Sequence, residues 1–499
     1  MIRRLVVMLG ITVVVAGMIA GGFLYWLLAG SGVRLGLERQ ASAWLGVPVH
    51  IGLAGARLFP EPGLHLERVE IGEPVQLTLG TVDVSANGQA LLSRRIEQAS
   101  LTITNSRIAM PLPFSWPAAA TNADGSDPLR LVSIQSIALR DVVITSRGRE
   151  LTVSADSALN GTRLLLRSFS ARTGGTSLEA LGEVDLAPRI DARLKVKANR
   201  LDVDELIALA GAFAPSAGRS AGTGSRLAPR LAARVTAETA RAGEVTVRQF
   251  ASDLEVDGTR LSLSPLTFQL FGGRYQGALV ATLGDTVMAS LRSRFIDLDA
   301  AQLADFGNSP GAITGALTGA GTFSGSGRDV GSILAGAGGQ GTASIVNGSI
   351  RHLDLVRTVV LFFGRPAPDA GPSSDKFERL DAAFTLARGV VTAQALSLHS
   401  DDADIVGGGT LALDDKTLNG RIDISLSEAL TRQAGTDLAR YTREDNRIVL
   451  PATVGGTLSG PRINIDAAAA AQRGLRNELQ RRLGDLLDQF KRAQQPAAP

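Results

Sequence analysis

The chain has 499 residues, of which 44% are hydrophobic and only 20% charged. This apolar content excludes a chain that is disordered throughout, and the single apolar run long enough to cross a bilayer excludes a multi-span membrane protein. The formal charge, 51 − 48 = +3, is nearly neutral. No Lys/Arg cluster with interleaved aromatic residues is present, so no nucleic-acid partner is expected.

The first predicted element is a transmembrane anchor over residues 5–28, a run of 24 uncharged residues that follows Arg3 and Arg4. A helix of this length measures about 36 Å, enough to cross a hydrocarbon core of roughly 30 Å. Residues 1–4 are then a short cytoplasmic tail. A cleaved signal peptide is the alternative, but its apolar region would be shorter, with small residues at the cut site. The anchor residues are Leu5, Val6, Leu9, Val13, Ile19, Phe23, Tyr25, Trp26 and Leu28.

A short helix is predicted over residues 35–45, because Gly46 would end it. From there to about residue 112 the apolar residues recur with period two, as Leu64 and Leu66 do between polar neighbours. This period is typical of strands with one buried face.

The same alternation returns further along the chain, for example at residues 261–263. Asn347-Gly348 has the sequence of a two-residue hairpin turn. At Asp202 and Asp299 a predicted strand runs into an apolar stretch, so each Asp is expected to cap a short helix. We therefore expect a mainly β chain of many antiparallel strands with short helices.

Three stretches rich in Pro, Gly, Ser, Ala and Asp, at residues 118–128, 215–229 and 366–374, are predicted linkers or exposed loops. They divide the chain into regions. The expected β regions are 32–117, 129–214, 230–365 (with short helices) and 375–466.

A carboxyl-terminal amphipathic helix is predicted over residues 467–492, starting near Asp466 as N-cap. Two interpretations of it stay open. The helix plugs or caps the end of the β structure, or it contacts a membrane surface or a partner. Its apolar face consists of Leu475, Leu479, Leu483, Leu486 and Phe490.

No catalytic signature is found in the sequence. The four His residues are far apart, and none belongs to a ligand-spaced pair. Residues 307–311 (GNSPG) match G-x-S-x-G, but Pro310 lacks the backbone N–H that the oxyanion would need. Residues 336–341 (GAGGQG) precede a predicted strand instead of the helix of a dinucleotide site. With no Cys either, we expect a protein that is not an enzyme and has no cofactor and no metal.

Motifs along nearly the whole chain carry a family resemblance through their order. They are residues 45–51 (LGVPVHI), 58–60 (LFP), 64–72 (LHLERVEIG), 270–277 (LFGGRYQG), 341–350 (GTASIVNGSI), 377–384 (FERLDAAF), 407–414 (GGGTLALD) and 450–461 (LPATVGGTLSGP). In this order they resemble the AsmA family of Gram-negative envelope proteins, which includes TamB and YhdP.

The resemblance implies a single-pass protein of the bacterial inner membrane with the bulk of the chain in the periplasm. The implied fold is an elongated, bent antiparallel β-sheet groove of repeated strand modules. Such proteins support outer-membrane biogenesis and the movement of phospholipid, so the implied partners are the inner membrane, phospholipids and outer-membrane assembly components. The family offers no catalytic residues.

Two functions compete at this stage. In the first, a hydrophobic β groove holds or conducts phospholipid acyl chains. In the second, the chain is a non-catalytic scaffold or chaperone-like factor that affects outer-membrane protein assembly and targeting. A lining of small branched side chains would suit an unspecific lipid path. The residues expected to line the groove are Leu64, Leu66, Leu101, Ile103, Leu261 and Leu263.

Overall fold

The computed structural model describes most of the chain. The described residues are 33–57, 63–87, 95–96, 98–110, 130–131, 133–212, 229–284, 286–351, 353, 358–359, 376–434, 443–444 and 447–493. They belong to two compact units, unit 1 (Met1–Pro265) and unit 2 (Leu266–Pro499). The anchor predicted at residues 5–28 lies outside the described residues. Among the described helices, none has the length and hydropathy needed to span a bilayer.

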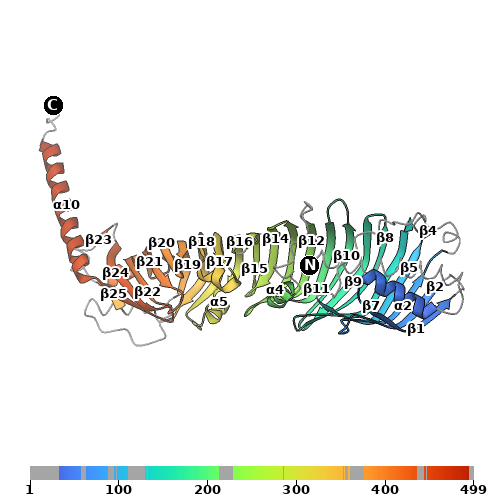
Figure 1. Ribbon diagram of the computed structural model, residues 1–499. Coiled ribbons are helices and arrows are strands. Elements are labelled where there is room, and N and C mark those ends of the chain that lie inside the picture. Colours follow the sequence, from blue (N-terminus) through green and yellow to red (C-terminus); the bar gives the residue numbers. More distant parts are fainter. Residues whose placement is uncertain are drawn as a thin grey trace, which may run out of the picture. The chain divides into compact units, whose positions relative to one another are not determined.

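Unit 1 is mainly β, and its long strands lie side by side in chain order (Figure 1). β4 and β6 form a separate two-stranded sheet. The strands are β1 (Val49–Arg57), β2 (Gly63–Ile71), β3 (Leu77–Ser85), β4 (Arg95–Ile96), β5 (Ala99–Met110), β6 (Arg130–Leu131), β7 (Ser133–Ser146), β8 (Arg149–Asn160), β9 (Arg163–Thr173), β10 (Thr176–Asp185), β11 (Asp191–Asp202), β12 (Arg230–Ala242) and β13 (Val245–Asp257). The helices are α2 (Val33–Leu45) and α4 (Val203–Ala212), and β14 (Arg260–Leu270) contains the boundary with unit 2.

The prediction of antiparallel pairing throughout is wrong for the separate pair of β4 and β6, which is parallel, and for two neighbouring pairs of the long sheet in unit 1. These two pairs are β5 with β7 and β11 with β12. Parallel neighbours need a crossover of a dozen or more residues. The chain supplies such lengths between the partners, at residues 111–132 and 203–229. Two of the stretches predicted as linkers lie within these connections.

Unit 2 is also mainly β. From β15 to β22 each strand pairs antiparallel with the next, and β22, β24 and β25 continue the sheet. The strands are β15 (Gly273–Thr282), β16 (Val287–Asp299), β17 (Ile313–Gly327), β18 (Gly338–Ile350), β19 (Lys376–Ala387), β20 (Val390–His399), β21 (Ala403–Ala412), β22 (Leu418–Leu426), β23 (Arg443–Glu444), β24 (Arg447–Thr457) and β25 (Gly460–Ile465). The helices are α5 (Ala300–Phe306), α6 (Val330–Ala335), α8 (Glu428–Ala434) and α10 (Ala467–Ala493).

The predicted Asp caps are confirmed. The Asp202 carboxylate accepts the backbone N–H of Glu205 at 3.0 Å and begins α4. The Asp299 carboxylate accepts the N–H of Ala301 at 2.9 Å and begins α5. Each cap satisfies a donor that the first helical turn leaves unpaired, and this ends the preceding strand.

The hairpin predicted at Asn347-Gly348 is wrong, because β18 runs straight through it. Asn347 has φ of 52°, and the register with β17 shifts beside it. An Asn with a positive φ also suits a β-bulge, where one extra residue is accommodated within a strand. The pattern therefore marks a bulge in this chain.

Each of the two units contains buried apolar clusters of its own. In unit 1, Leu37 of α2 packs in a cluster with the apolar faces of β1–β3, β5 and β7–β9, where Leu101 is 0% exposed. In unit 2 the buried cluster lies mainly on β20–β22, β24 and β25, where Ile424 and Leu450 are 0% exposed. A further buried cluster of unit 1 includes Ile134 and Ile137 of β7 and Leu164 of β9, each at most 1% exposed.

Candidate functional site

A single file of apolar residues crosses eight strands of unit 2, and we call it the apolar row. Its members are consecutive cross-strand partners from β15 to β22, so they lie on one face of the sheet. It contains no polar side chain. The apolar row consists of Leu279, Leu291, Phe323, Gly339, Leu386, Val391, Leu411 and Leu418.

The opposite face carries the contrasting pattern. On β16–β22 the residues one step along the strands form a polar row, and on β15 this position is Ala278. The polar row lies on the opposite face, because successive residues of a strand point to opposite sides. The polar row consists of Arg292, Thr322, Gln340, Thr385, Thr392, Thr410 and Asn419. The sheet of unit 2 therefore has one hydrophilic face and one apolar face.

Every member of the apolar row is half-buried. Their neighbours on adjacent strands bury part of each side chain. No further layer among the described residues buries the rest, in contrast to Ile424, which is 0% exposed. Helix α6 lies over the end of β17, since a Cβ added at Gly325 of β17 would lie 2.5 Å from the backbone oxygen of Ile333 in α6. The helix does not bury the row at this point, because Phe323 on the same strand is still half-buried. A continuous strip of apolar surface is thus left facing solvent.

Aromatic rings lie over glycines on this face. A Cβ added at Gly341 would come within 2.9 Å of the Phe384 ring, and one at Gly339 within 2.6 Å of the Phe323 ring. Tyr275 covers Gly277 in the same way, and its hydroxyl pairs with Ser293 Oγ at 3.0 Å. Burial raises the pKa of this tyrosine. The rings fill the space that side chains would take at these three glycines.

In unit 1 four of the predicted lining residues are not at an open surface, and this prediction is wrong for them. Leu64, Leu66, Leu101 and Ile103 are at most 5% exposed and belong to the buried cluster that includes α2. Period two shows which side of a strand is apolar, but not what covers that side. Leu261 and Leu263 on β14 are half-buried, and their role as lining stays a prediction.

Helix α4 covers more of the apolar face in unit 1. Leu206 and Leu209 of α4 line a cavity of about 80 Å³ together with Leu164 and Phe169 of β9. The Glu205 carboxylate fixes the start of the helix by accepting the backbone N–H of Gly175 at 3.0 Å. Helix α4 therefore covers this part of the apolar face and leaves only a small cavity beneath it.

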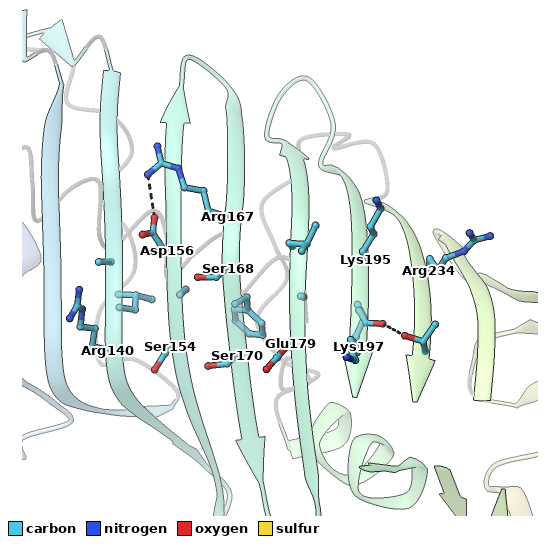
Figure 2. A pocket seen from close by; sticks show the side chains of 18 residues that line it. Arg140, Ser154, Asp156, Arg167, Ser168, Ser170, Glu179, Lys195, Lys197 and Arg234 are labelled. Atoms are coloured by element: carbon cyan, nitrogen blue, oxygen red, sulfur yellow. Dashed lines mark hydrogen bonds and ion pairs between the residues drawn. The ribbon is translucent and has the colours of Figure 1, made fainter. Parts of the chain in front are cut away.

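The polar face of unit 1 carries a broad concavity of about 770 Å³ over β7–β12 (Figure 2). Arg167 pairs there with Asp156 at 3.5 Å, and Lys195, Lys197 and Arg140 lie at other points of the lining. Unit 2 has a similar concavity of about 880 Å³, where Arg379 pairs with Asp381 at 2.7 Å. By residue type both linings are mainly charged, hydroxyl-bearing or small.

The described histidines, His50, His65 and His399, lie on β1, β2 and β20. The His399 side chain hydrogen-bonds to Asp404, whose carboxylate also accepts from the Arg447 guanidinium at 2.5 Å. The Glu378 carboxylate lies 3.6 Å from Nε2 of His399. The bond to Asp404 raises the pKa of His399. Burial alone would raise the pKa of Asp404, but its hydrogen bonds with Arg447 and His399 outweigh burial and hold that pKa below its usual value. The described residues contain no group of three or more His, Asp or Glu placed to hold a metal ion.

The His399–Asp404 contact predicts a pH-dependent stability. Because its pKa is raised in the folded state, protonated His399 stabilises the fold below the ordinary value of about 6.5, and this contribution disappears as the pH rises through the folded pKa. His399→Gln is therefore expected to lower the urea midpoint more at about pH 5.5 than at about pH 8.5. Equal losses at both pH values, measured by circular dichroism, would contradict this assignment.

The carboxyl-terminal helix is confirmed as α10, with Asp466 as its N-cap through the N–H of Ala469 at 2.9 Å. The exposed fractions of Leu475, Leu479 and Leu483 are 64%, 62% and 59%. These three leucines do not plug or cap the sheet. The side chains of Leu486 and Phe490 lie outside the described residues.

Sequence reasoning missed the glycine positions of the apolar face, although residues 270–277 contain an aromatic-Gly-Gly signal of this kind. Comparison of the chain with protein-family models, curated proteins and solved structures found no match. The function is therefore inferred from the residues and their arrangement.

Proposed function

We propose that the chain is an AsmA-like protein of the bacterial inner membrane that holds or conducts phospholipid acyl chains on the apolar face of unit 2. In this role it supports outer-membrane homeostasis from the periplasm. The observation that carries the proposal is the apolar row, which is half-buried and without a polar side chain across eight strands.

The dimensions and energetics suit an acyl chain. Eight strands spaced at roughly 4.8 Å give a row about 34 Å long, comparable with the hydrocarbon thickness of a bilayer, about 30 Å. Each buried methylene contributes about 0.8 kcal/mol. A chain lying along the row would therefore be held by many small contacts.

The composition of the apolar row favours a lipid path over a selective pocket. A selective site places a few convergent polar groups among its apolar side chains. On this face the rings of Phe323 and Phe384 lie over Gly339 and Gly341, and no charged residue belongs to the apolar row. The headgroup would remain in water while the acyl chain covers the apolar strip.

The remaining support comes from the sequence. The apolar run at residues 5–28 suits an inner-membrane anchor, and the order of motifs resembles the AsmA family.

The adjacent residues Leu386 and Thr385 offer a matched test, because they lie on opposite faces of β19. The chain has no Cys, so Leu386→Cys or Thr385→Cys in the full chain gives one site for a benzophenone maleimide. After illumination in lipid-containing membranes, mass spectrometry should find phospholipid adducts at position 386 and few at 385. Equal labelling would refute the proposal, and adducts at 386 with proteins alone would favour the scaffold function.

A further inference from the structure

Helix α10 leaves the sheet of unit 2 after its first turns (Figure 1). Among the side chains of α10 that the structure describes, those that dock it lie near its start. Ala470 is 5% exposed, and Arg473 makes a two-pronged pair with Asp423 of β22 at 3.1 and 2.9 Å. The helix has 27 residues, which correspond to about 40 Å at 1.5 Å per residue. Most of this length extends beyond the residues that dock it.

The exposed part carries an apolar stripe, which consists of Leu475, Leu479 and Leu483. They recur at intervals of four residues, so they lie above one another on one side of the helix. All three are about 60% exposed. Helices in proteins gain most of their stability from packing an apolar face. A surface that covers this stripe is therefore to be expected.

The charges indicate what kind of surface it is. Arg476 and Arg482 stand three residues before and after Leu479, so helix geometry places them roughly 60° to either side of it. Both are exposed. The sequence of α10 has six Arg or Lys residues and three Asp or Glu residues, 6 − 3 = +3. Basic residues thus border the apolar stripe on both sides.

We propose that α10 lies on the surface of an anionic phospholipid membrane. The stripe of three leucines sits at the boundary between headgroups and acyl chains, and Arg476 and Arg482 contact lipid phosphates on either side. This arrangement is typical of amphipathic helices that bind membrane interfaces. Pairing with a second α10 would instead bring the flanking arginines of two copies near one another. The membrane contact does not depend on the apolar face of unit 2 holding lipid.

The test uses the full chain in nanodiscs of phosphatidylcholine, to which separate vesicles are added. Leu483→Cys is labelled with the polarity-sensitive dye NBD, and the control is Leu334→Cys on α6, a leucine 68% exposed. Vesicles rich in phosphatidylglycerol should shift the emission of the 483 label to the blue and leave the 334 label unchanged. Vesicles of phosphatidylcholine alone should have little effect on either label.

Second variants test the two parts of the contact. With the 483 label in place, Leu475→Gln with Leu479→Gln should weaken vesicle binding more than tenfold, and Arg476→Gln about fivefold, since a basic residue near an anionic surface contributes about 1 kcal/mol. Unchanged binding by the double variant overturns the proposal, as does an equal response to both kinds of vesicle. A blue shift that grows with protein concentration in the absence of vesicles assigns the stripe to a second copy. Lipid adducts at position 386 should persist in these variants, so the two proposals can fail separately.

Discussion

Leu386→Asp is expected to lower the phospholipid that co-purifies with the full chain at least tenfold. The substitution places a carboxylate in the middle of the apolar row, where a bound acyl chain would cover it. Removing an ionised group from water costs several kcal/mol, and about 1.4 kcal/mol corresponds to tenfold in affinity. Lipid extraction and mass spectrometry of the purified protein measure the loss.

Two variants control this result. Thr385→Asp adds the same charge one residue away on the polar face, so its lipid content should match that of the unchanged protein. Ile424→Asp puts the charge at a position that is 0% exposed and should prevent folding. The urea midpoint of the Leu386→Asp protein shows whether it stays folded, because Leu386 is only half-buried whereas Ile424 is fully buried. Normal lipid content in a folded Leu386→Asp protein would contradict the proposed function.

Much of the fold could be predicted from local patterns. The period of two predicted strands, and the Asp residues at 202 and 299 predicted two of the helix starts. These features depend on neighbours in the sequence. The parallel pairing of β5 with β7 could not be predicted in this way, because it depends on how residues 111–132 return the chain to the sheet. Asn347-Gly348 likewise fits both a turn and a bulge, and only the neighbouring strand decides between them.

The candidate site was predicted less well for a physical reason. Leu101 and Leu386 both belong to apolar faces of strands, yet one is 0% exposed and the other half-buried. The difference comes from the elements that lie above each face, and α2 joins the cluster that buries Leu101. Alternation in one strand carries no information about such a covering layer. The sequence therefore predicts an apolar face but not which parts of it remain uncovered.

Gly341→Ala is expected to lower the free energy of unfolding by about 1–3 kcal/mol, as overpacking typically does. The added Cβ would lie 2.7 Å from the Ala320 carbonyl oxygen and 2.9 Å from the Phe384 ring, so the ring must leave its place over the glycine. Gly455→Ala in β24 is the matched control, since nothing lies within 4 Å of its added Cβ. It should be neutral or stabilising by about 0.4–1 kcal/mol. Urea unfolding followed by circular dichroism compares the two, and equal effects would mean that Phe384 does not depend on Gly341 for its position. A displaced ring would also disturb the apolar face, so Gly341→Ala should reduce lipid adducts at position 386 in the folded protein, whereas Gly455→Ala should not.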